Sequence, residues 1–548
     1  MRVYAPLLRG LKRLGILGKM SASGPLMPSL TRRRFLAATA ALSATFPLHL
    51  SAQESSNATD AAPQQFSFDI LTDEMRALAA APHVAPEPVG GFLADLDYDD
   101  YRLVRFRPDR MRWASETSTL ALAAFPMGWL FREPVILYEV ADGMAGEMRF
   151  TTEDFEYLND LGERIPAMTD MPGVAGFRLH HPLNRPDVMD ELVAFVGASY
   201  FRALGRGSAY GLSARGLALN TATGRGEEFP RFSRFYMERG TGPGAITVYA
   251  ALESPSVTGA YRFVFFPGAT TTIEVTARLF FRADVEELGI APLTSMYLYS
   301  EKNHTQFDDF RPKVHDSDGL RIRRADGEVI WRPLNNPPRL TGSYFPETAP
   351  RSFGLHQRER NFEQFQDTEA NYDRRPSLDI EPIGDWGAGY VRLVEIPSDL
   401  EANDNIVAYW VPEAPARAGD AREFAYRMHW GDLPLDPADP LAHVAVTRAG
   451  HGGVAGVEVR PGLRKFVVDF TGGFLDALGP EAEIAPVVTV SEGEIISTVL
   501  QRVPQNGVWR LFIDLRADNG AVVELSAHLA GYDRKLTENW LYQWINAS

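Results

Sequence analysis

Alternation of apolar and polar residues with a period of two recurs along most of this chain. In TTIEVTARLFFR, residues 271–282, one side of an extended backbone carries only Ile273, Val275, Ala277, Leu279 and Phe281. Side chains of a β-strand point to its two faces in turn, so this pattern predicts a strand with one buried face. Similar stretches, bounded by Gly, Pro or Asp, are ITVYAALES, YRFVFFPG, KFVVDFTG, EIAPVVTVS, VWRLFIDLRA and AVVELSAHLAG. Many short strands with frequent turns predict an all-β protein in which sheets pack on sheets.

Helical signals are few. ILTDEMRALAAAP predicts a short helix with Thr72 as its N-cap and Pro82 as its end, and DVMDELVAFVG predicts another. Regular alternation of strands and helices is missing, so we do not expect a doubly wound fold.

The chain has 548 residues, which is enough for two or more domains. VPEAPARAGDAREF combines prolines, alanines and a Gly-Asp turn and is typical of a linker. We therefore expect a large domain over 66–411, a linker over 412–422 and a smaller domain over 423–548. The smaller part contains six to eight predicted strands, the size of an immunoglobulin-like sandwich.

The first 52 residues look like an export signal. TRRRFLAATAALSATFPLHLSAQ has an arginine cluster, a modestly apolar stretch and small residues before Ala52, which is the twin-arginine pattern. Residues 53–65 form a polar tether in this interpretation. We expect the mature protein to be periplasmic.

Charge and cysteine content exclude several classes of function. Residues 1–52 carry 8 Lys and Arg and no acid, so the remainder has 55 − 8 = 47 basic and 71 acidic side chains, a net charge of −24. A strongly acidic protein is a poor partner for nucleic acid or an anionic membrane. The chain has no cysteine, which excludes disulfides, zinc–thiolate sites and cysteine nucleophiles. No Walker loop, GxSxG or HExxH motif occurs.

Two acidic stretches are candidates for chemistry. PKVHDSDGLRI places His315, Asp316 and Asp318 in one short turn, where they suit a turn cap, a cation site or acid–base chemistry. DSDG resembles the start of a calcium loop, but the glutamate expected after the glycine is missing, so we expect no metal and no cofactor. In EIPSDLEANDNIVAYW, Asp404 stands directly before an apolar strand.

Aromatic residues and arginines surround these carboxylates in the sequence. FQDTEANYDRRPS and IEPIGDWGAG contribute Tyr372, Arg375 and Trp386. Aromatic faces stack on sugar rings, and charged groups hydrogen-bond to hydroxyls, so the mixture suits a neutral carbohydrate. It equally suits an ion-pair network beneath a loop, and the residues alone leave both interpretations open.

The chain resembles the periplasmic glucan biosynthesis proteins OpgG and OpgD, also called MdoG and MdoD. The similar motifs run in order from Phe66 to Trp544: FVGASYFRALG, YGLSARGLAL, VTGAYRF, LGIAPLTSMY, VHDSDGL, RPLNNP, FGLHQRERNFEQFQD, YDRRPSLDIEP, NDNIVAYW and TENWLYQW. The twin-arginine pattern resembles OpgD more closely than OpgG.

This resemblance implies a large galactose-mutarotase-like β-sandwich followed by a smaller immunoglobulin-like β-sandwich. It implies a role in making osmoregulated periplasmic glucans, by inverting endo-β-1,2-glucanase action on the β-1,2-glucan backbone. Some relatives instead transglycosylate and close the glucan into a ring. The resemblance also implies a homodimer and a functional link to a membrane glucosyltransferase.

Catalytic roles carry over to two positions. Asp404, in NDNIV, matches the family's general acid, and Asp316, in HDSD, matches the general base, which reaches its water through a relay that includes a substrate hydroxyl. An acid at Asp404 must stay protonated near neutral pH, so we expect burial or a nearby negative charge, such as Glu401, to raise its pKa. The candidate substrate-binding residues are His315, Tyr372, Arg375, Trp386 and Glu401.

One departure from the family pattern favours a rival function. Asp379 stands in RPSLDIEP where the family has an aromatic residue, so a stacking surface for sugar is absent there. This favours a non-catalytic glucan-binding or scaffold protein that assists the glucosyltransferase. A metal-dependent lyase that uses HDSD is a third alternative.

Overall fold

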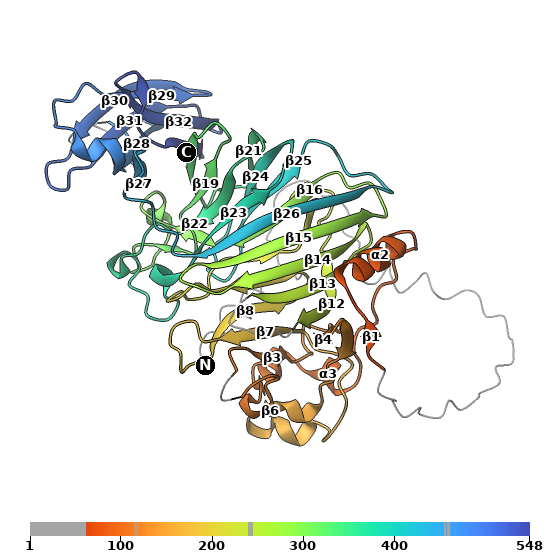
Figure 1. Ribbon diagram of the computed structural model, residues 1–548. Helices are drawn as coiled ribbons and strands as arrows, with labels where there is room; N and C mark the ends of the chain where they lie inside the picture. Colours follow the sequence, from red (N-terminus) through yellow and green to blue (C-terminus); the bar gives the residue numbers. More distant parts are fainter. Residues whose placement is uncertain (1–61, 116–117, 239–244, 454–455, 457–460, 548) are drawn as a thin grey trace, which may run out of the picture.

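The computed structural model describes residues 62–115, 118–238, 245–453, 456 and 461–547, and these form a mostly β molecule (Figure 1). The all-β prediction is confirmed. The export signal over 1–52 and most of the predicted tether lie outside the described residues. The end of that tether is not free, because Gln64 and Gln65 pair with Ala145 and Met144.

A long, mostly antiparallel sheet runs through the whole molecule. Its strands, in order of pairing, are β1 (Gln64–Gln65), β5 (Met144–Glu147), β4 (Ile136–Ala141), β12 (Arg231–Glu238), β13 (Ile246–Glu253), β14 (Val257–Phe266), β15 (Thr271–Phe281), β26 (Ala421–Gly431), β23 (Ser377–Ile383), β22 (Ser352–His356), β19 (Gly319–Arg323), β20 (Val329–Pro333), β34 (Asn539–Ile545), β32 (Val522–Gly531) and β29 (Ala485–Val490), with β33 (Arg534–Lys535) beside β32.

A second sheet faces the first half of this long sheet. It contains β21 (Thr341–Thr348), β24 (Ala388–Glu395), β25 (Ile406–Pro412), β16 (Leu288–Ser295), β10 (Ser213–Arg215), β9 (Tyr200–Ala203), β8 (Asp190–Val196), β7 (Gly176–His181) and β3 (Ala121–Phe125), with β11 (Ala218–Leu219) beside β16. The largest apolar core lies between these two sheets. Val275 and Leu279 of β15 and Phe195 of β8 belong to it and are at most 1% exposed.

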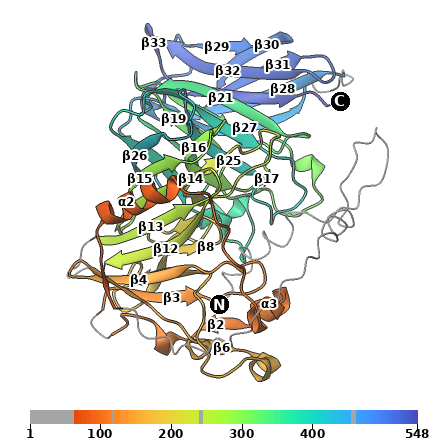
Figure 2. The same cartoon turned by 90° about the vertical axis from the view of Figure 1, so that its right-hand side faces the viewer.

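The chain after β26 builds a smaller sandwich, drawn in blue at the upper end of Figures 1 and 2. One layer is a four-stranded sheet of β27 (His443–His451), β28 (Leu463–Thr471), β31 (Trp509–Arg516) and β30 (Glu494–Arg502), and the other is β34, β32 and β29. A separate apolar core around Phe466, Leu511 and Trp540 fills the space between them. Parallel pairing of β34 with β20 at Trp540 and Trp331 joins this sandwich to the rest.

The predicted linker over 412–422 does not separate two domains. Strand β26, which follows it, pairs with β15 along one edge and with β23 along the other, so it lies inside the long sheet. Phe424, Tyr426 and Trp430 of β26 belong to the large core. The connection between the two sandwiches is instead the segment between Gly431 and His443.

The helical predictions are half right. The first helix is α2 (Phe68–Ala79), but its N-cap is Ser67, whose hydroxyl accepts a hydrogen bond from the Ile70 amide, and Thr72 lies buried inside the helix. It packs on the outer face of β14 and β15 (Figure 1). The second predicted helix is wrong, because residues 190–196 form β8, in which Leu192 and Val193 are fully buried in the sheet.

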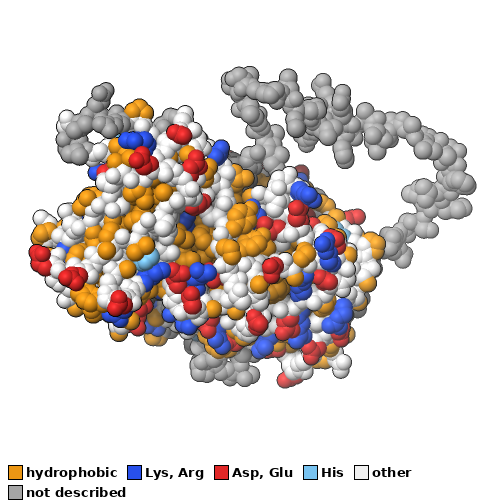
Figure 3. All heavy atoms as spheres, turned by 90° about the horizontal axis from the view of Figure 1, so that it is seen from above, with side chains coloured by type: hydrophobic (Ala, Val, Ile, Leu, Met, Phe, Trp, Pro, Cys, Tyr) orange, Lys and Arg blue, Asp and Glu red, His pale blue; other side chains and the backbone are white. Residues whose placement is uncertain are grey.

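The remaining elements are short. They are α3 (Phe92–Asp95), α4 (Tyr98–Tyr101), the pair β2 (Val104–Phe106) and β6 (Phe155–Tyr157), and the pair β17 (Tyr297–Tyr299) and β18 (Val314–His315). No helix among the described residues has the length and apolarity needed to cross a bilayer. Acidic and basic side chains are interspersed on the face seen in Figure 3.

Candidate active site

The two predicted catalytic aspartates are anchored to the same short piece of backbone. The Asp316 amide donates to the carbonyl of Met296 at 2.8 Å. The side chain of Asn405 accepts from the Tyr297 amide at 2.8 Å and donates to the Tyr297 carbonyl at 3.0 Å. Asp404 directly precedes Asn405, so the backbone segments that carry two aspartates 88 positions apart in the sequence are both fixed at residues 296–297.

Asp316 lies in a charged but buried environment. Its side chain is 4% exposed and forms an ion pair with Arg375. Burial raises the pKa of Asp316 to about 6; the charges of Asp404 and Glu401 add to this rise, and Arg375 and Arg202 oppose it. Asp316 is therefore ionised at neutral pH and is a stronger base than an ordinary aspartate.

Asp404 lies nearer the surface. Its side chain is 35% exposed, and an oxygen of its carboxyl is 3.8 Å from the guanidinium of Arg202, on β9. Of the two expected surroundings, burial or a nearby negative charge, the structure does not give Asp404 full burial. The electrostatic influence that Asp404 and Glu401 exert on Asp316 indicates that all three carboxyl groups share one region.

Arg311 connects the loops that carry these residues. Its guanidinium lies 2.7 Å from Asp309, 2.6 Å from Asp367 and 2.9 Å from Glu401. Asp367 belongs to the loop that leads to Arg375, and Glu401 belongs to the loop that ends at Asp404. One cation thus holds three carboxylates from three segments together, which favours a fixed arrangement of the loops.

Tyr372 and Arg375 join this cluster as buried supports. The Tyr372 hydroxyl donates to Glu401, and its ring lies 4.4 Å from the Arg375 guanidinium carbon. Arg375 also donates to the carbonyl of Ala370 at 3.0 Å. Both side chains were predicted to contact substrate, and the structure brings both to the site, where each contacts protein groups.

His315 lies behind Asp316 and not on the surface. Its ring stacks on Tyr297 at 5.4 Å, and its Nδ1 is 2.9 Å from the side-chain oxygen of Gln357. Burial lowers the pKa of His315 to about 3, so the ring is neutral at physiological pH. The structure therefore places His315, which was predicted to bind substrate, in a buried packing position where its side chain contacts protein groups.

Trp386 is a core residue. It is 7% exposed, its Nε1 donates to the Ala425 carbonyl at 3.1 Å, and its ring packs against Trp410 and Tyr426. It lies at the Ala388 end of β24, whereas the site loop leaves the Glu395 end of that strand. The ring belongs to the core between the two large sheets, so the structure does not bring this predicted substrate-binding residue to the two aspartates.

Asp318 supports the turn-cap interpretation of its motif. One of its carboxylate oxygens accepts from the amides of Arg358 and Glu359, at 2.7 and 2.9 Å. Across the described residues, no three His, Asp or Glu side chains are grouped so that they could hold a metal ion.

Asp379 contacts neither Asp316 nor Asp404. It accepts from the Nε2 of His356 at 3.2 Å. The neighbouring cation Arg321 lies 3.7 Å from Glu538 of the smaller sandwich, so Asp379 lies near the junction of the two sandwiches. The position at which the family has an aromatic residue is therefore not in contact with the two predicted catalytic aspartates.

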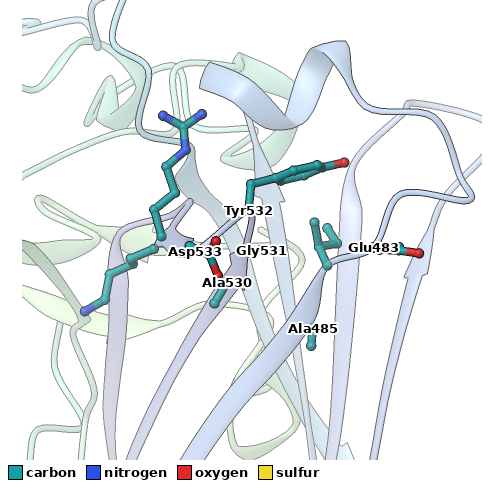
Figure 4. A pocket seen from close by; sticks show the side chains of 9 residues that line it. Glu483, Ala485, Ala530, Gly531, Tyr532 and Asp533 are labelled. Atoms are coloured by element: carbon teal, nitrogen blue, oxygen red, sulfur yellow. The ribbon is translucent and has the colours of Figure 1, made fainter.

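Sequence reasoning missed three supporting residues: Arg202, Arg311 and Asn405. Arg202 and Asn405 lie inside motifs quoted above and Arg311 adjoins one, but only the fold shows which groups they contact. A shallow hollow at the far end of the smaller sandwich is not part of this site; Figure 4 shows Tyr532 and Asp533 at its rim, and none of its lining residues belongs to the carboxylate cluster.

Comparisons with known proteins fix the family. The family model "Periplasmic glucan biosynthesis protein, MdoG" matches residues 66–544. "Glucans biosynthesis protein G" of Cereibacter sphaeroides is 60% identical over 95% of this chain and 99% of its own length. The protein of the same name from Rhodopseudomonas palustris strain BisA53 is 42% identical over 94% of this chain and 100% of its own length. Both relatives carry the name protein G, so they do not support the closer likeness to OpgD. The chain belongs to the MdoG family of periplasmic glucan biosynthesis proteins.

Proposed function

We propose that this protein is a periplasmic enzyme that cleaves the β-1,2-glucan backbone with inversion, with Asp404 as general acid and Asp316 as general base. The observation that carries the proposal is that the segments bearing these two aspartates are fixed to neighbouring residues, through the Asp316 amide at Met296 and the Asn405 side chain at Tyr297. Inverting glycosidases need two carboxyl groups on opposite sides of the scissile bond, far enough apart to admit a water molecule.

The two aspartates differ in the way that these roles require. Asp404 is the more exposed of the two and can reach a glycosidic oxygen of a chain lying over it. A sugar chain lying over this carboxyl covers it and excludes water from it.

Asp316 lies deeper, and its raised pKa suits a base that works near neutral pH. Because its side chain is 4% exposed, a water on the far face of the sugar reaches it most readily through an intervening hydroxyl. This burial supports the proton relay that the family resemblance implies.

Export by the twin-arginine route completes the proposal. The RRRFL stretch at Arg32–Leu36 and the family's periplasmic name agree on the compartment. In the periplasm the enzyme acts on glucan produced by a membrane glucosyltransferase.

Incubation of the purified chain with linear β-1,2-glucan, followed by mass spectrometry, tests this function. Shorter linear chains support hydrolysis. Products one water lighter than the open chain of the same length identify cyclising transglycosylation at the same two carboxylates. Glucan that binds but keeps its length contradicts the proposal and supports the scaffold alternative. Activity that is unchanged in Asp404→Asn rejects the assignment of the acid.

A further inference from the structure

The hollow of the smaller sandwich exposes an aromatic side chain at its rim. It is lined by residues 483–485, where β29 begins, and by residues 530–535, which form the hairpin of β32 and β33. Its volume of about 760 Å³ lies within the range of small-molecule sites. Tyr532 is 54% exposed, and Figure 4 shows its side chain reaching out from the hairpin on the side of Glu483.

Tyr532 occupies a backbone conformation that a bulky residue rarely adopts. The φ angles of Tyr532 and Asp533 are 54° and 57°, in the left-handed region, and the two residues form the hairpin turn between Gly531 and Arg534. Turns of this kind favour Asn-Gly or Asp-Gly, because a larger side chain is crowded by the backbone. Residues held in such conformations cluster at ligand-binding and active sites. The tyrosine is therefore poorly suited to the turn, which indicates a role for its ring beyond the fold.

Neighbouring groups hold this ring and its hairpin in place. The edge of the Tyr532 ring meets Phe474 with the ring centres 5.5 Å apart, and the Arg534 guanidinium lies 4.5 Å from the centre of the Phe474 ring. Lys535 forms an ion pair with Glu328, in the turn between β19 and β20 of the large sandwich. A binding surface that is already ordered loses less conformational entropy when a ligand binds.

The polar groups around the ring suit an uncharged ligand rich in hydroxyls. Glu483, Asp533 and Arg534 are exposed, and with Lys535 they give two acidic and two basic side chains without a net charge. The carboxylates accept hydrogen bonds, and the guanidinium of Arg534, stacked by its face, donates from its edge. Carboxylates repel an anion, whereas sugar hydroxyls both donate and accept, and a sugar ring stacks on an aromatic face.

We propose that this hollow is a second glucan-binding site, in which the Tyr532 ring stacks on a glucose unit and the charged rim hydrogen-bonds to its hydroxyls. The site is separate from the carboxylate cluster and holds a sugar chain without cleaving it. The choice of glucan as the ligand rests on the proposed function, whereas the site itself rests on the exposed ring, its strained turn and the uncharged balance of the rim.

Isothermal titration calorimetry with a short β-1,2-linked gluco-oligosaccharide tests the inference. The Asp404→Asn chain is used, and mass spectrometry verifies that the oligosaccharide keeps its length. We expect two oligosaccharides to bind each chain. Tyr532→Asn in this background removes the ring but suits the left-handed turn, so we expect one binding event to weaken about tenfold or more while the melting temperature does not fall.

Two further variants distinguish loss of the ring from a general disturbance. Tyr532→Phe keeps the stacking face, and its dissociation constant should stay within about threefold of the original. Val499→Asn removes a side chain that is 50% exposed on β30, in the other sheet of the same sandwich, and should leave both binding events unchanged.

The inference is overturned if one oligosaccharide binds and Tyr532→Asn leaves its affinity unchanged, or if Val499→Asn weakens binding as much as Tyr532→Asn. Either result leaves the proposed cleavage standing. Failure of the proposed function has a different signature, which is β-1,2-glucan that keeps its length when it is incubated with the unaltered chain.

Discussion

Two buried aspartates, one in each sandwich, show how similar partners lead to different chemistry. In the smaller sandwich, Asp469 accepts from Arg448 at 2.8 Å and from Arg510 at 2.7 Å. Burial opposes its ionisation, but these hydrogen bonds outweigh burial and hold the pKa of Asp469 below its usual value. In the large sandwich, Asp316 has one contacting arginine and two neighbouring carboxylates, and its pKa rises to about 6.

The difference lies in how completely each charge is compensated. Two guanidinium groups stabilise a fixed carboxylate, which is a structural arrangement. One guanidinium opposed by like charges leaves a carboxyl group that takes up and releases a proton near neutral pH, which is a property of catalytic groups. The comparison therefore predicts that a substitution at Asp316 lowers activity, whereas a substitution at Asp469 lowers stability.

The largest expected effect is on catalysis. Asp404→Asn removes the proposed proton donor and Asp316→Asn removes the proposed base, and each should lower the rate of β-1,2-glucan cleavage by about 100- to 10,000-fold. The rate is followed as newly formed reducing ends. Asp399→Asn, an exposed residue of the same loop as Asp404, is the matched control and should retain full activity. A residual rate within tenfold of the original in either variant would remove that residue from the mechanism.

Asp469→Asn should produce the opposite result. It leaves two arginines without their shared carboxylate and should lower the free energy of unfolding by about 2 kcal/mol, because buried charge partners are costly to remove. Denaturant unfolding measures this loss, and the turnover of folded protein should not change. A fall in turnover at unchanged stability would show that the two aspartates do not differ in this way.

Arg311 tests whether the arginine that connects the loops positions the site. Arg311→Gln leaves Asp309, Asp367 and Glu401 to repel each other, and we expect kcat/KM to fall about tenfold at neutral pH, as misplacement of catalytic groups does. The deficit relative to the original protein should shrink as the pH falls, because protonation removes the repulsion. Arg417→Gln breaks an exposed ion pair with Asp284 and is the control. A deficit that is the same at every pH would indicate a packing role alone.

The pH profile should report the state of Asp316. A base must be ionised, so kcat/KM should fall below about pH 6, the raised pKa of Asp316. Glu401 contributes to that rise. Glu401→Gln should therefore lower the pKa of Asp316. The acidic side of the pH profile of kcat/KM should then move to lower pH by a fraction of a unit. A shift of the acidic side of this profile to higher pH would contradict the claim that Glu401 raises the pKa of Asp316.

The smallest effect is expected at Trp386. Its ring packs inside the large core, so Trp386→Phe should leave KM for the glucan unchanged while slightly lowering the melting temperature. A clear rise in KM would indicate that Trp386 contacts the glucan.

Local patterns predicted the strands well and the assembly less well. β15 was predictable because its alternation covers residues 271–281 without interruption. The domain boundary was not predictable. A connection rich in proline and alanine has the same composition whether it joins two strands of one sandwich or links two separate sandwiches. The alternation of Phe424, Tyr426, Met428 and Trp430 after that connection was the available sign of one more core strand.

The site was predictable only through family resemblance. Asp316 and Asp404 lie in one region because the Asp316 amide bonds to Met296 and Asn405 bonds to the backbone at Tyr297, and no spacing along the chain reveals these contacts. The burial of Trp386 could not be predicted, because its place between Gly-Asp and Gly-Ala does not show that the ring packs in the core.

The configuration of the newly formed reducing end tests the central claim most directly. Proton NMR recorded in the first minutes of glucan cleavage distinguishes the two anomers before they equilibrate. Inversion at a β-1,2 linkage with Asp404 as acid and Asp316 as base predicts that the α-anomer forms first and that neither asparagine variant produces it. Initial formation of the β-anomer, or an unaltered glucan, would contradict the account.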